Sequence, residues 1–302
     1  THTIHPAWIY SRKAFVITGA VCTLLIISVS AYGILNQWKL KIKTFDVKVD
    51  KQVKEKDSLK IVLLADLHFG YSNGRRHAEL LVKEINAQSP DLVCIAGDVF
   101  DNEYEGLKNP EKTASILRSI HSKYGVYACW GNHDLSEPIL AGFTFRTPKK
   151  EYDDPRMYEF LKAANIRLLN DESVLIDDSF YLIGRKDPSR CRKTADTRKT
   201  PSALTESLNL RRPVIFMDHQ PGELDEVARA GADLDLCGHT HDGQLFPLNI
   251  CTSLVWENSC GYLKKGNMHN IVTSGAGIWG PNMRTATDSE ICVMNVEFKK
   301  SL

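Results

Sequence analysis

The chain has 302 residues, a formal net charge of +1 and 43% hydrophobic residues. This balance is that of a folded protein with a sizeable core, and the charge gives no reason to expect nucleic acid as a partner. The eight cysteines show no disulfide or zinc spacing. The motifs C-x-x-C, G-x-S-x-G and H-E-x-x-H are absent from the sequence, so dithiol, serine-hydrolase and zinc-protease chemistry lack support.

The N-terminal region contains one long uncharged segment, residues 14–35. As a helix it would be about 33 Å long, enough for a bilayer core of ~30 Å. We predict a tail over 1–13, a transmembrane anchor over 14–35, and a charged linker over 36–58 with one edge strand near Phe45–Val49. A cleaved signal peptide is the alternative, because residues 28–30 resemble a small-residue cleavage site. By the positive-inside rule, lysines after the helix favour a cell-membrane protein with a cytoplasmic body, although basic residues before Thr1 would reverse this.

The body alternates strands and helices. Short apolar runs predict buried strands at 61–65, 92–96, 126–130, 214–217 and 234–237. Helices are predicted at 76–87, 111–121, 156–164, 202–208 and 223–230, three of them started by Pro and the last stopped by Gly231. Early βαβ units favour a mostly parallel sheet. Segments 166–169, 174–176 and 180–184 and the C-terminal strands, including 291–298, predict a second sheet.

Polar motifs follow the five apolar runs. They are Asp66-Leu67-His68, Gly97-Asp98, Gly131-Asn132-His133-Asp134, His219 and Gly238-His239-Thr240-His241. Ligands of open α/β sheets bind beyond the carboxyl ends of the strands, and in Asp-x-His a strand would direct both side chains to one face. Carboxylate, imidazole and carboxamide groups without thiolate suit hard or borderline divalent ions. Seven ligands suit two ions that share one carboxylate, the arrangement phosphatases and nucleases use.

In this order, the motifs resemble those of the calcineurin-like metallophosphoesterases, over roughly Leu59 to the C-terminus. The resemblance implies that Asp66, His68 and His241 hold one ion, that Asn132, His219 and His239 hold a second, and that Asp98 bridges them. It implies that His133 faces the scissile phosphate and that Asp134 orients His133. The implied ions are two divalent metals, Mn²⁺ first, with Fe, Zn or Co as alternatives. The implied α/β fold is a four-layer αββα sandwich of two mixed sheets flanked by helices, spanning 59–302.

Residues 273–284 and the Asp-Gly-Gln-Leu after His241 are similar to a membrane-associated bacterial branch that cleaves phosphodiesters or pyrophosphates. This similarity implies a phosphohydrolase in which a metal-bridging hydroxide attacks a membrane or envelope-derived, lipid-linked phosphate ester. The alternatives are a phosphomonoesterase and a non-enzymatic, membrane-anchored binding protein that retains the metal site. The intact set of seven ligands favours an enzyme. The loops after Phe69 and around Phe143–Tyr152 would decide between mono- and diesters.

One further motif is resolved by its context, and two other features leave alternatives open. Residues 275–280 fit G-x-G-x-x-G, but Pro281 and the single strand that follows exclude a dinucleotide fold and favour a loop near the metals. The basic run 185–199 is either a solvated loop or a loop that binds an anionic substrate. His77, at the start of a helix, is either structural or a substrate contact.

Overall fold

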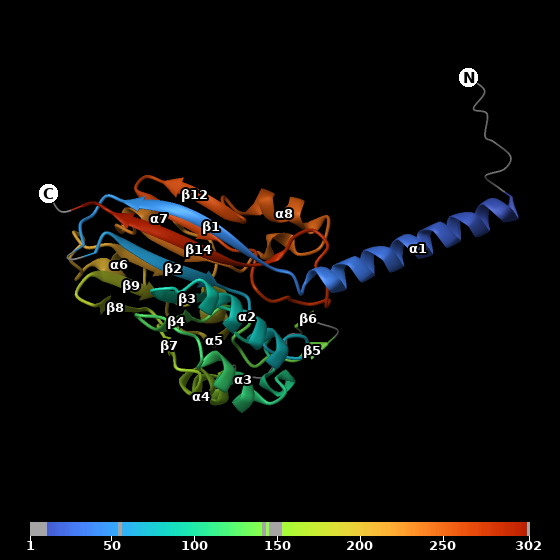
Figure 1. The fold of residues 1–302 in the computed structure, drawn as a ribbon, viewed down its shortest axis with the longest axis horizontal. Helices are drawn as coiled ribbons and strands as arrows, with labels where there is room; N and C mark the ends of the chain where they lie inside the picture. The colour runs from blue at the N-terminus through green and yellow to red at the C-terminus, as the bar shows by residue number, and fades with distance from the viewer. Residues whose placement is uncertain (1–10, 54–55, 141–142, 145–152, 301–302) are drawn as a thin grey trace, which may run out of the picture.

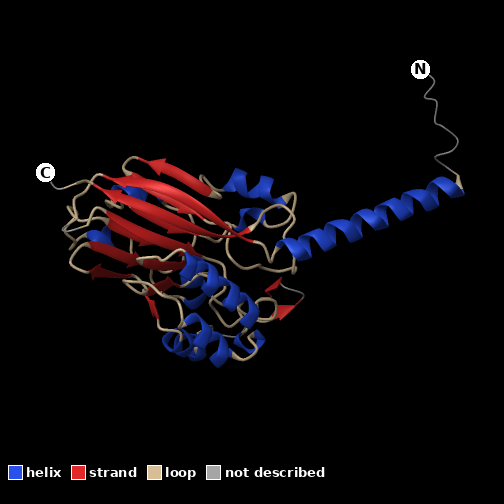
Figure 2. Ribbon diagram, in the orientation of Figure 1, coloured by secondary structure: helices blue, strands red, loops and turns tan. Residues whose placement is uncertain are grey.

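The body of the protein consists of four layers, seen in a computed structural model that describes residues 11–53, 56–140, 143–144 and 153–300. Two six-stranded sheets face each other, with helices on both outer faces, and a long helix projects from one end (Figures 1 and 2). The predicted αββα sandwich of mixed sheets is therefore confirmed.

The first sheet has the strand order β1-β14-β2-β3-β4-β7. Its members are β1 (Leu40–Val49), β14 (Ser289–Phe298), β2 (Ser58–Leu64), β3 (Leu92–Ala96), β4 (Val126–Cys129) and β7 (Ile166–Leu168). Strands β2, β3, β4 and β7 are parallel, whereas β14 runs antiparallel to β2 and parallel to β1. The prediction that 166–169 and 291–298 belong to the second sheet was wrong, because both segments pair with strands of the first.

The second sheet has the order β12-β13-β11-β10-β9-β8. Its members are β12 (Gly261–Lys265), β13 (Met268–Val272), β11 (Leu234–Cys237), β10 (Val214–Met217), β9 (Phe180–Gly184) and β8 (Glu172–Ile176). The four central strands are parallel, and antiparallel β12 and β8 close the edges. A two-stranded hairpin, β5 (Ile139–Leu140) and β6 (Phe143–Thr144), lies outside both sheets.

Helices begin where the sequence supplies caps. Those of the body are α2 (Arg75–Ala87), α3 (Pro110–Leu117), α4 (Pro155–Ala163), α5 (Pro188–Thr194), α6 (Pro201–Thr205), α7 (Leu224–Arg229) and α8 (Leu248–Val255). Asp154, Asp187 and Thr200 each accept a hydrogen bond from a backbone N–H of the first turn, which satisfies one donor that the helix cannot pair. Asn109 precedes α3 in a left-handed conformation and makes no side-chain cap. Helices α5 and α8 were not predicted.

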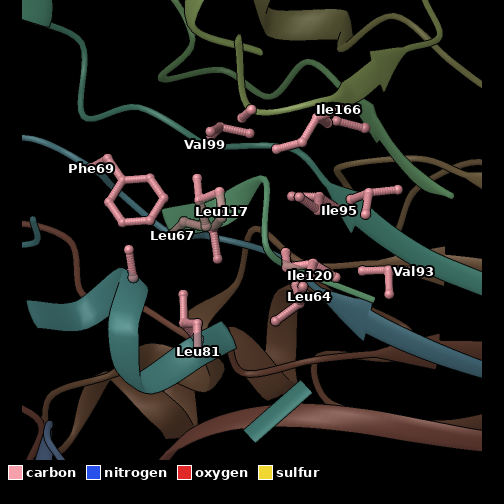
Figure 3. Close-up of a cluster of buried hydrophobic side chains, with 14 of the residues drawn as sticks. Leu64, Leu67, Phe69, Leu81, Val93, Ile95, Val99, Leu117, Ile120 and Ile166 are labelled. Carbon is pink, nitrogen blue, oxygen red and sulfur yellow. The ribbon is translucent and has the colours of Figure 1, made fainter. Parts of the chain in front are cut away.

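Three apolar clusters separate the four layers. Val62 and Leu64 face the helices of the first sheet, whereas Ile61 and Leu63 face the second sheet. Figure 3 shows Leu64 with Leu81 of α2 in the outer cluster. A third cluster packs α6 and α7 on β9 and β10. Because side chains alternate along a strand, a strand covered on both faces must read as the unbroken apolar run from which it was predicted.

Helix α1 (Arg12–Asn36) is the one candidate membrane span among the described residues, long and apolar enough to cross a bilayer and almost entirely exposed. Its C-terminal end, by contrast, is fixed to the body. Asn36 donates to the carbonyl of Thr287 at 3.0 Å, and Gln37 donates to that of Asn282 at 3.0 Å. The edge strand predicted near Phe45–Val49 is present as β1, which starts five residues earlier, at Leu40, and pairs with β14.

Candidate metal centre

The candidate site lies where loops after strands of both sheets meet. Strands β2, β3 and β4 of the first sheet lead to Asp66, Asp98 and Asn132. Strands β10 and β11 of the second sheet lead to His219 and to His239. The sequence had suggested one sheet edge, but the site is built across the interface between two sheets.

Backbone conformation, rather than strand alternation, aims these side chains. Asp66, His68, Asp98, His239 and His241 all have positive φ, from 45° to 74°. They therefore lie beyond the strand ends in the left-handed region, which non-glycine residues enter rarely and which often marks functional sites. The prediction that a strand presents Asp66 and His68 on one face was wrong, although the two side chains do converge.

Glycines leave room for this convergence. Gly97 has φ +82°, and a β-carbon there would collide with the ring of His219. A β-carbon at Gly131 would collide with the carboxylate of Asp98. Each position therefore accepts only glycine without displacing a site residue.

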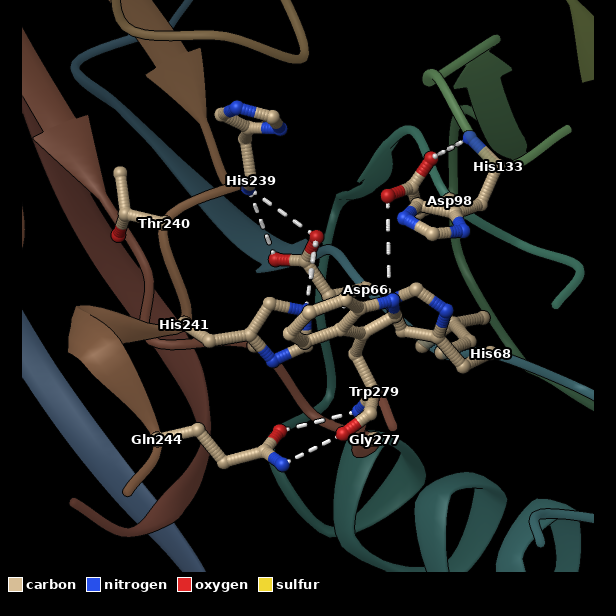
Figure 4. A network of polar contacts seen from close by, with 12 residues as sticks. Asp66, His68, Asp98, His133, His239, Thr240, His241, Gln244, Gly277 and Trp279 are labelled. Atoms are coloured by element: carbon tan, nitrogen blue, oxygen red, sulfur yellow. Dashed lines mark hydrogen bonds and ion pairs between the residues drawn. The ribbon is translucent and has the colours of Figure 1, made fainter. Parts of the chain in front are cut away.

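The first group of candidate ligands is Asp66, His68 and His241. The Nε2 atoms of His68 and His241 lie 3.1 Å apart, and His241 Nε2 lies 3.6 Å from Asp66 Oδ1. Figure 4 shows these three side chains and Asp98 pointing toward one another. Both oxygens of Asp66 accept the backbone N–H of His239, which connects the two sheets at this point.

The second group is Asp98, His219 and His239. His219 Nε2 lies 3.1 Å from Asp98 Oδ2, 3.2 Å from His239 Nδ1 and 3.1 Å from Asn132 Oδ1. Asp98 Oδ2 also lies 3.8 Å from His68 Nε2, so one carboxylate oxygen faces both groups. The structure thus brings together all seven residues that the sequence singled out as ligands; their roles as ligands stay predictions.

Burial keeps the imidazoles of His239 and His241 in the neutral form that binds a metal, whereas the carboxylates beside His68 and His219 raise the pKa of those two rings against the effect of burial. Burial lowers the pKa of His239 to about 3, and it lowers the pKa of His241 well below its usual range, so both imidazoles are neutral near pH 7. Burial opposes ionisation of Asp98, but the imidazoles of His219 and His133 outweigh it and hold the Asp98 pKa well below its usual range. Neutral imidazoles beside an ionised carboxylate are the forms that bind a divalent cation. The donor set therefore fits the predicted metals.

Neighbouring groups orient the candidate ligands, and the sequence did not reveal one of them. The ring of His219 lies with Nδ1 2.8 Å from the carbonyl of Ala96, so Nδ1 donates and Nε2 is free for an ion. Asp101 Oδ1 lies 3.4 Å from His68 Nδ1, within ion-pair distance of that ring. Asp101 follows Asp98 by three residues in a loop with no periodicity, so only its carboxylate hinted at a role.

His133 lies beside the first group, 5.0 Å from the His68 ring between centroids. Its Nδ1 contacts Asn102 Oδ1 at 2.5 Å, and Asn102 Nδ2 donates to Glu137, which fixes the amide with its oxygen toward the imidazole. Burial lowers the pKa of His133 to about 4. The prediction that Asp134 orients His133 was wrong, because Asn102 occupies that position.

Asp134 instead shapes the loops that carry the ligands. Its two oxygens accept the backbone N–H groups of Phe100 at 2.9 Å and Gly131 at 2.7 Å. These bonds tie the loop after β3 to the loop after β4. Burial raises the Asp134 pKa to about 7.

A cavity of about 310 Å³ opens beside both groups. Its wall includes Asp98, His133 and His239 on one side and Leu245, Leu248 and Trp279 on the other. Gln244 fixes the backbone of Trp279 through two hydrogen bonds, of 2.6 Å and 3.0 Å. The cavity therefore joins the candidate ligands to an apolar wall.

The remaining features singled out in the sequence are explained by their contacts in the fold. Gly277 donates its N–H to the carbonyl of Asp66, so the glycine-rich loop lies against the first ligand loop, as predicted. Arg185 is buried against Asp218, and Arg198 pairs with Asp218 and Glu223, so carboxylates neutralise these two cations of the basic run. His77 is buried against Phe69 and Trp38. The loop around 143–152 lies mostly outside the described residues.

Comparison with known proteins decides the family. Residues 59–243 match the family described as calcineurin-like phosphoesterase. The chain belongs to this family. An uncharacterised metallophosphoesterase of Campylobacter jejuni is 30% identical over 92% of this chain and 70% of its own length.

Two further relatives are informative. A transmembrane protein with metallophosphoesterase domain from Danio rerio is 29% identical over 90% of this chain, and this chain spans 61% of that protein. The UDP-2,3-diacylglucosamine pyrophosphatase LpxG of Chlamydia trachomatis is 24% identical over 92% of this chain and 96% of its own length. The family is one of metal-dependent hydrolases that act on phosphoester bonds.

Proposed function

We propose that the protein is a dinuclear phosphohydrolase that cleaves a phosphodiester or pyrophosphate bond in a membrane or envelope-related substrate. The observation that carries this is the pair of ligand groups with Asp98 facing both, next to His133 and an open cavity. Asp66, His68 and His241 would hold one ion and Asn132, His219 and His239 the other. When bound, two divalent ions lower the pKa of a coordinated water and neutralise charge on phosphoryl oxygens.

Residues of the protein then position the substrate and supply a proton to its leaving group. His133, held through Nδ1 by Asn102, presents Nε2 to the leaving oxygen and, once protonated there against the effect of burial, supplies a proton or a positive charge. The apolar wall formed by Leu245, Leu248 and Trp279 excludes water from one side of the phosphate. The ester group that does not react extends along this wall.

The preference for a diester or pyrophosphate rests on the cavity. Among the described residues that line it there is neither Lys nor Arg, the side chains that would favour the double charge of a terminal phosphate. The name of the Chlamydia relative gives a pyrophosphatase of a diacylated sugar nucleotide, which supports an apolar substrate. Helix α1 and the transmembrane relative support anchorage in a membrane. We keep Mn²⁺ as the first metal and the cytoplasmic side as the expected side of the body.

An activity screen tests the proposal. The full chain, purified in detergent with Mn²⁺, is assayed on bis-nitrophenyl phosphate, nitrophenyl phosphate and a nucleoside diphosphate sugar. We expect the diester or the pyrophosphate to be cleaved at least about tenfold faster than the monoester, with an Asp98→Ala chain as the blank for contaminating phosphatases. Preference for the monoester would make the protein a phosphomonoesterase. Two bound metals without hydrolysis of any phosphate ester would favour the binding protein.

A further inference from the structure

The segment around α8 exposes apolar side chains that the body of the protein does not cover. None of the eight residues of α8 is buried. Leu254 is 82% exposed and Val255 74%, and Phe246, just before the helix, is 69% exposed. Residues 243–256 contain no charged side chain. A contiguous uncharged surface of this kind marks an interaction site.

This surface is attached to the base of α1. The backbone N–H of Arg284 donates to the carbonyl of Gly33 at 3.0 Å, and Thr285 packs on the same glycine. Thr285 in turn accepts the backbone N–H of Phe246 at 3.1 Å and donates its own to the carbonyl of Gln244. One loop therefore holds the end of α1 and the start of the α8 segment, and Figure 1 shows both at the same end of the body.

The length of α1 determines how deep in the membrane the loop of Arg284 and Thr285 lies. The uncharged segment 14–35 is about as long as a bilayer core is thick, so Gly33 falls at the edge of the hydrocarbon. Trp38 and Lys39, which follow, are residues typical of the head-group region. Phe246 and α8, held by the loop that contacts Gly33, must lie near the same level.

We propose that Phe246 and α8 dip into the bilayer surface, so that the cavity beside the ligand groups opens toward the lipid. This rests on the proposed membrane anchorage and deepens the proposed function. Leu248, Cys251 and Thr252 of α8 line the cavity, whereas Ile250 and Leu254, on the side of the helix turned away from them, do not. One face of the helix therefore serves the substrate and the other the bilayer. The apolar part of the substrate would pass along α8 without leaving the membrane, and its phosphate would reach His133.

Site-directed fluorescence tests the position of α8. A single cysteine carrying an environment-sensitive dye is placed at Leu254 in the full chain, with the accessible Cys22, Cys251 and Cys260 changed to Ser. The protein is reconstituted in vesicles of equal parts phosphatidylethanolamine and phosphatidylglycerol, some with a nitroxide near the head group. Leu25→Cys, in the middle of α1, is the positive control. Leu210→Cys is the matched negative control, because Leu210 is an exposed leucine beside Lys51, past the far end of β1 from α1.

We expect the nitroxide lipids to quench the dye at positions 25 and 254 and to leave the dye at position 210 unchanged. Quenching at 25 with position 254 behaving like 210 would overturn the proposal for α8 and leave the anchor intact. If position 25 is not quenched, α1 is not in the bilayer, and the proposed anchorage fails together with this inference.

A kinetic test separates the surface from the catalytic chemistry. Ile250→Asp and Leu254→Asp together should reduce turnover of a vesicle-borne nitrophenyl phosphodiester of a long-chain alcohol by roughly tenfold. The same chain should hydrolyse soluble bis-nitrophenyl phosphate at the unaltered rate, and Leu210→Asp should change neither reaction. Unaltered turnover of the vesicle-borne substrate, or equal losses on both substrates, would contradict the proposal. Failure of the unaltered chain on both substrates would instead count against the proposed hydrolase.

Discussion

The two sheets contribute different chemistry to the site. Loops of the first sheet supply both carboxylates and the amide, Asp66, Asp98 and Asn132, whereas the loops of the second supply only imidazoles, His219, His239 and His241. The first-sheet loops are bonded to one another, for example through His133 N–H to Asp98 Oδ1 at 2.7 Å.

The second-sheet ligands are placed by contacts to the first sheet. His239 donates its N–H to Asp66, and His219 donates through Nδ1 to the carbonyl of Ala96. The first sheet and its loops, here called the frame, therefore position the imidazoles that the second sheet supplies. Removing Asp98 from the frame should affect both metal positions, whereas removing one imidazole of the second sheet should affect only one.

The largest expected effect comes from Asp98→Ala. Asp98 faces both ligand groups, so we expect metal content to fall from two ions per chain to none and turnover to fall roughly 10³-fold or more. His219→Ala should remove about one ion. Elemental analysis after desalting measures both. Equal metal loss in the two variants would contradict the division between the sheets.

A matched control is available in the second sheet. Asp235 is a buried carboxylate on β11 that bonds to Asn270 and belongs to neither ligand group. Asp235→Ala should keep both ions even if it lowers stability. Metal loss in this variant would mean that any buried carboxylate change empties the site.

The next effect in size concerns His133. His133→Ala should retain both ions but lose about 10²–10⁴ in turnover, because general acid assistance is lost while the ligands stay. The loss should be smaller for a nitrophenyl diester than for an alkyl diester, since nitrophenolate needs little protonation. Steady-state rates on both esters, with metal analysis of the same samples, measure this. Equal losses on the two esters, or the loss of an ion, would refute the role.

Asn102 should have a smaller effect through His133. Asn102→Leu removes the acceptor that fixes Nδ1 of His133, so we expect turnover to fall about tenfold and the pH profile of turnover to shift. Asn102→Asp, which keeps an oxygen at this position, should recover most of the rate. An unchanged pH profile in Asn102→Leu would indicate a structural role alone.

His133 and Asn102 also show which residues of the site the sequence could reveal. His133 and the seven candidate ligands follow apolar runs directly, so strand ends located them. Asp101 and Asn102 lie three and four residues beyond Asp98 in a loop, where no sequence periodicity indicates the direction of a side chain. Asp134 was assigned to the wrong partner because its bonds to Phe100 and Gly131 depend on the packing of two loops.

The fold was predictable to a similar degree. Runs such as 61–65, which are apolar at every position, correctly predicted strands buried between two layers. Sheet membership was not predictable, because the pairing of β7 with β4 and of β14 with β2 joins segments distant in the chain. The start of β1 was missed because its alternation changes phase at Thr44-Phe45. Helix α8 was missed because it is only eight residues long and no side chain caps its start.

Metal binding should stabilise the contact between the sheets. An ion that binds only the folded state adds about 2.7 kcal/mol to the free energy of unfolding at a concentration 100 times its dissociation constant. We therefore expect Mn²⁺ to raise the midpoint of chemical unfolding of the chelator-treated protein, and to leave that of Asp98→Ala unchanged. Urea titrations with and without Mn²⁺ measure both. Equal stabilisation of the two chains would indicate binding elsewhere.

The smallest effect concerns the edge of the frame, where α1 joins it. A chain that starts at Lys39 keeps all of β1, and we expect it to be soluble, folded and able to bind both ions. A chain that starts at Thr44 loses the pairing of Leu40–Lys43 with Ser289–Cys292 and leaves the buried Glu290 without Lys43, which lies 2.7 Å away.

Removing the charged partner of a buried carboxylate costs about 2 kcal/mol, so the shorter chain should unfold at lower urea. It should still hydrolyse bis-nitrophenyl phosphate, because every ligand group lies beyond β1. Lys43→Met in the longer chain separates the ion pair from the strand pairing, since it keeps the strand and removes the charge. If Lys43→Met is as stable as the unaltered longer chain, the cost lies in the lost strand pairs; if neither truncated chain hydrolyses the soluble diester, the end of α1 is part of the frame that holds the ligands.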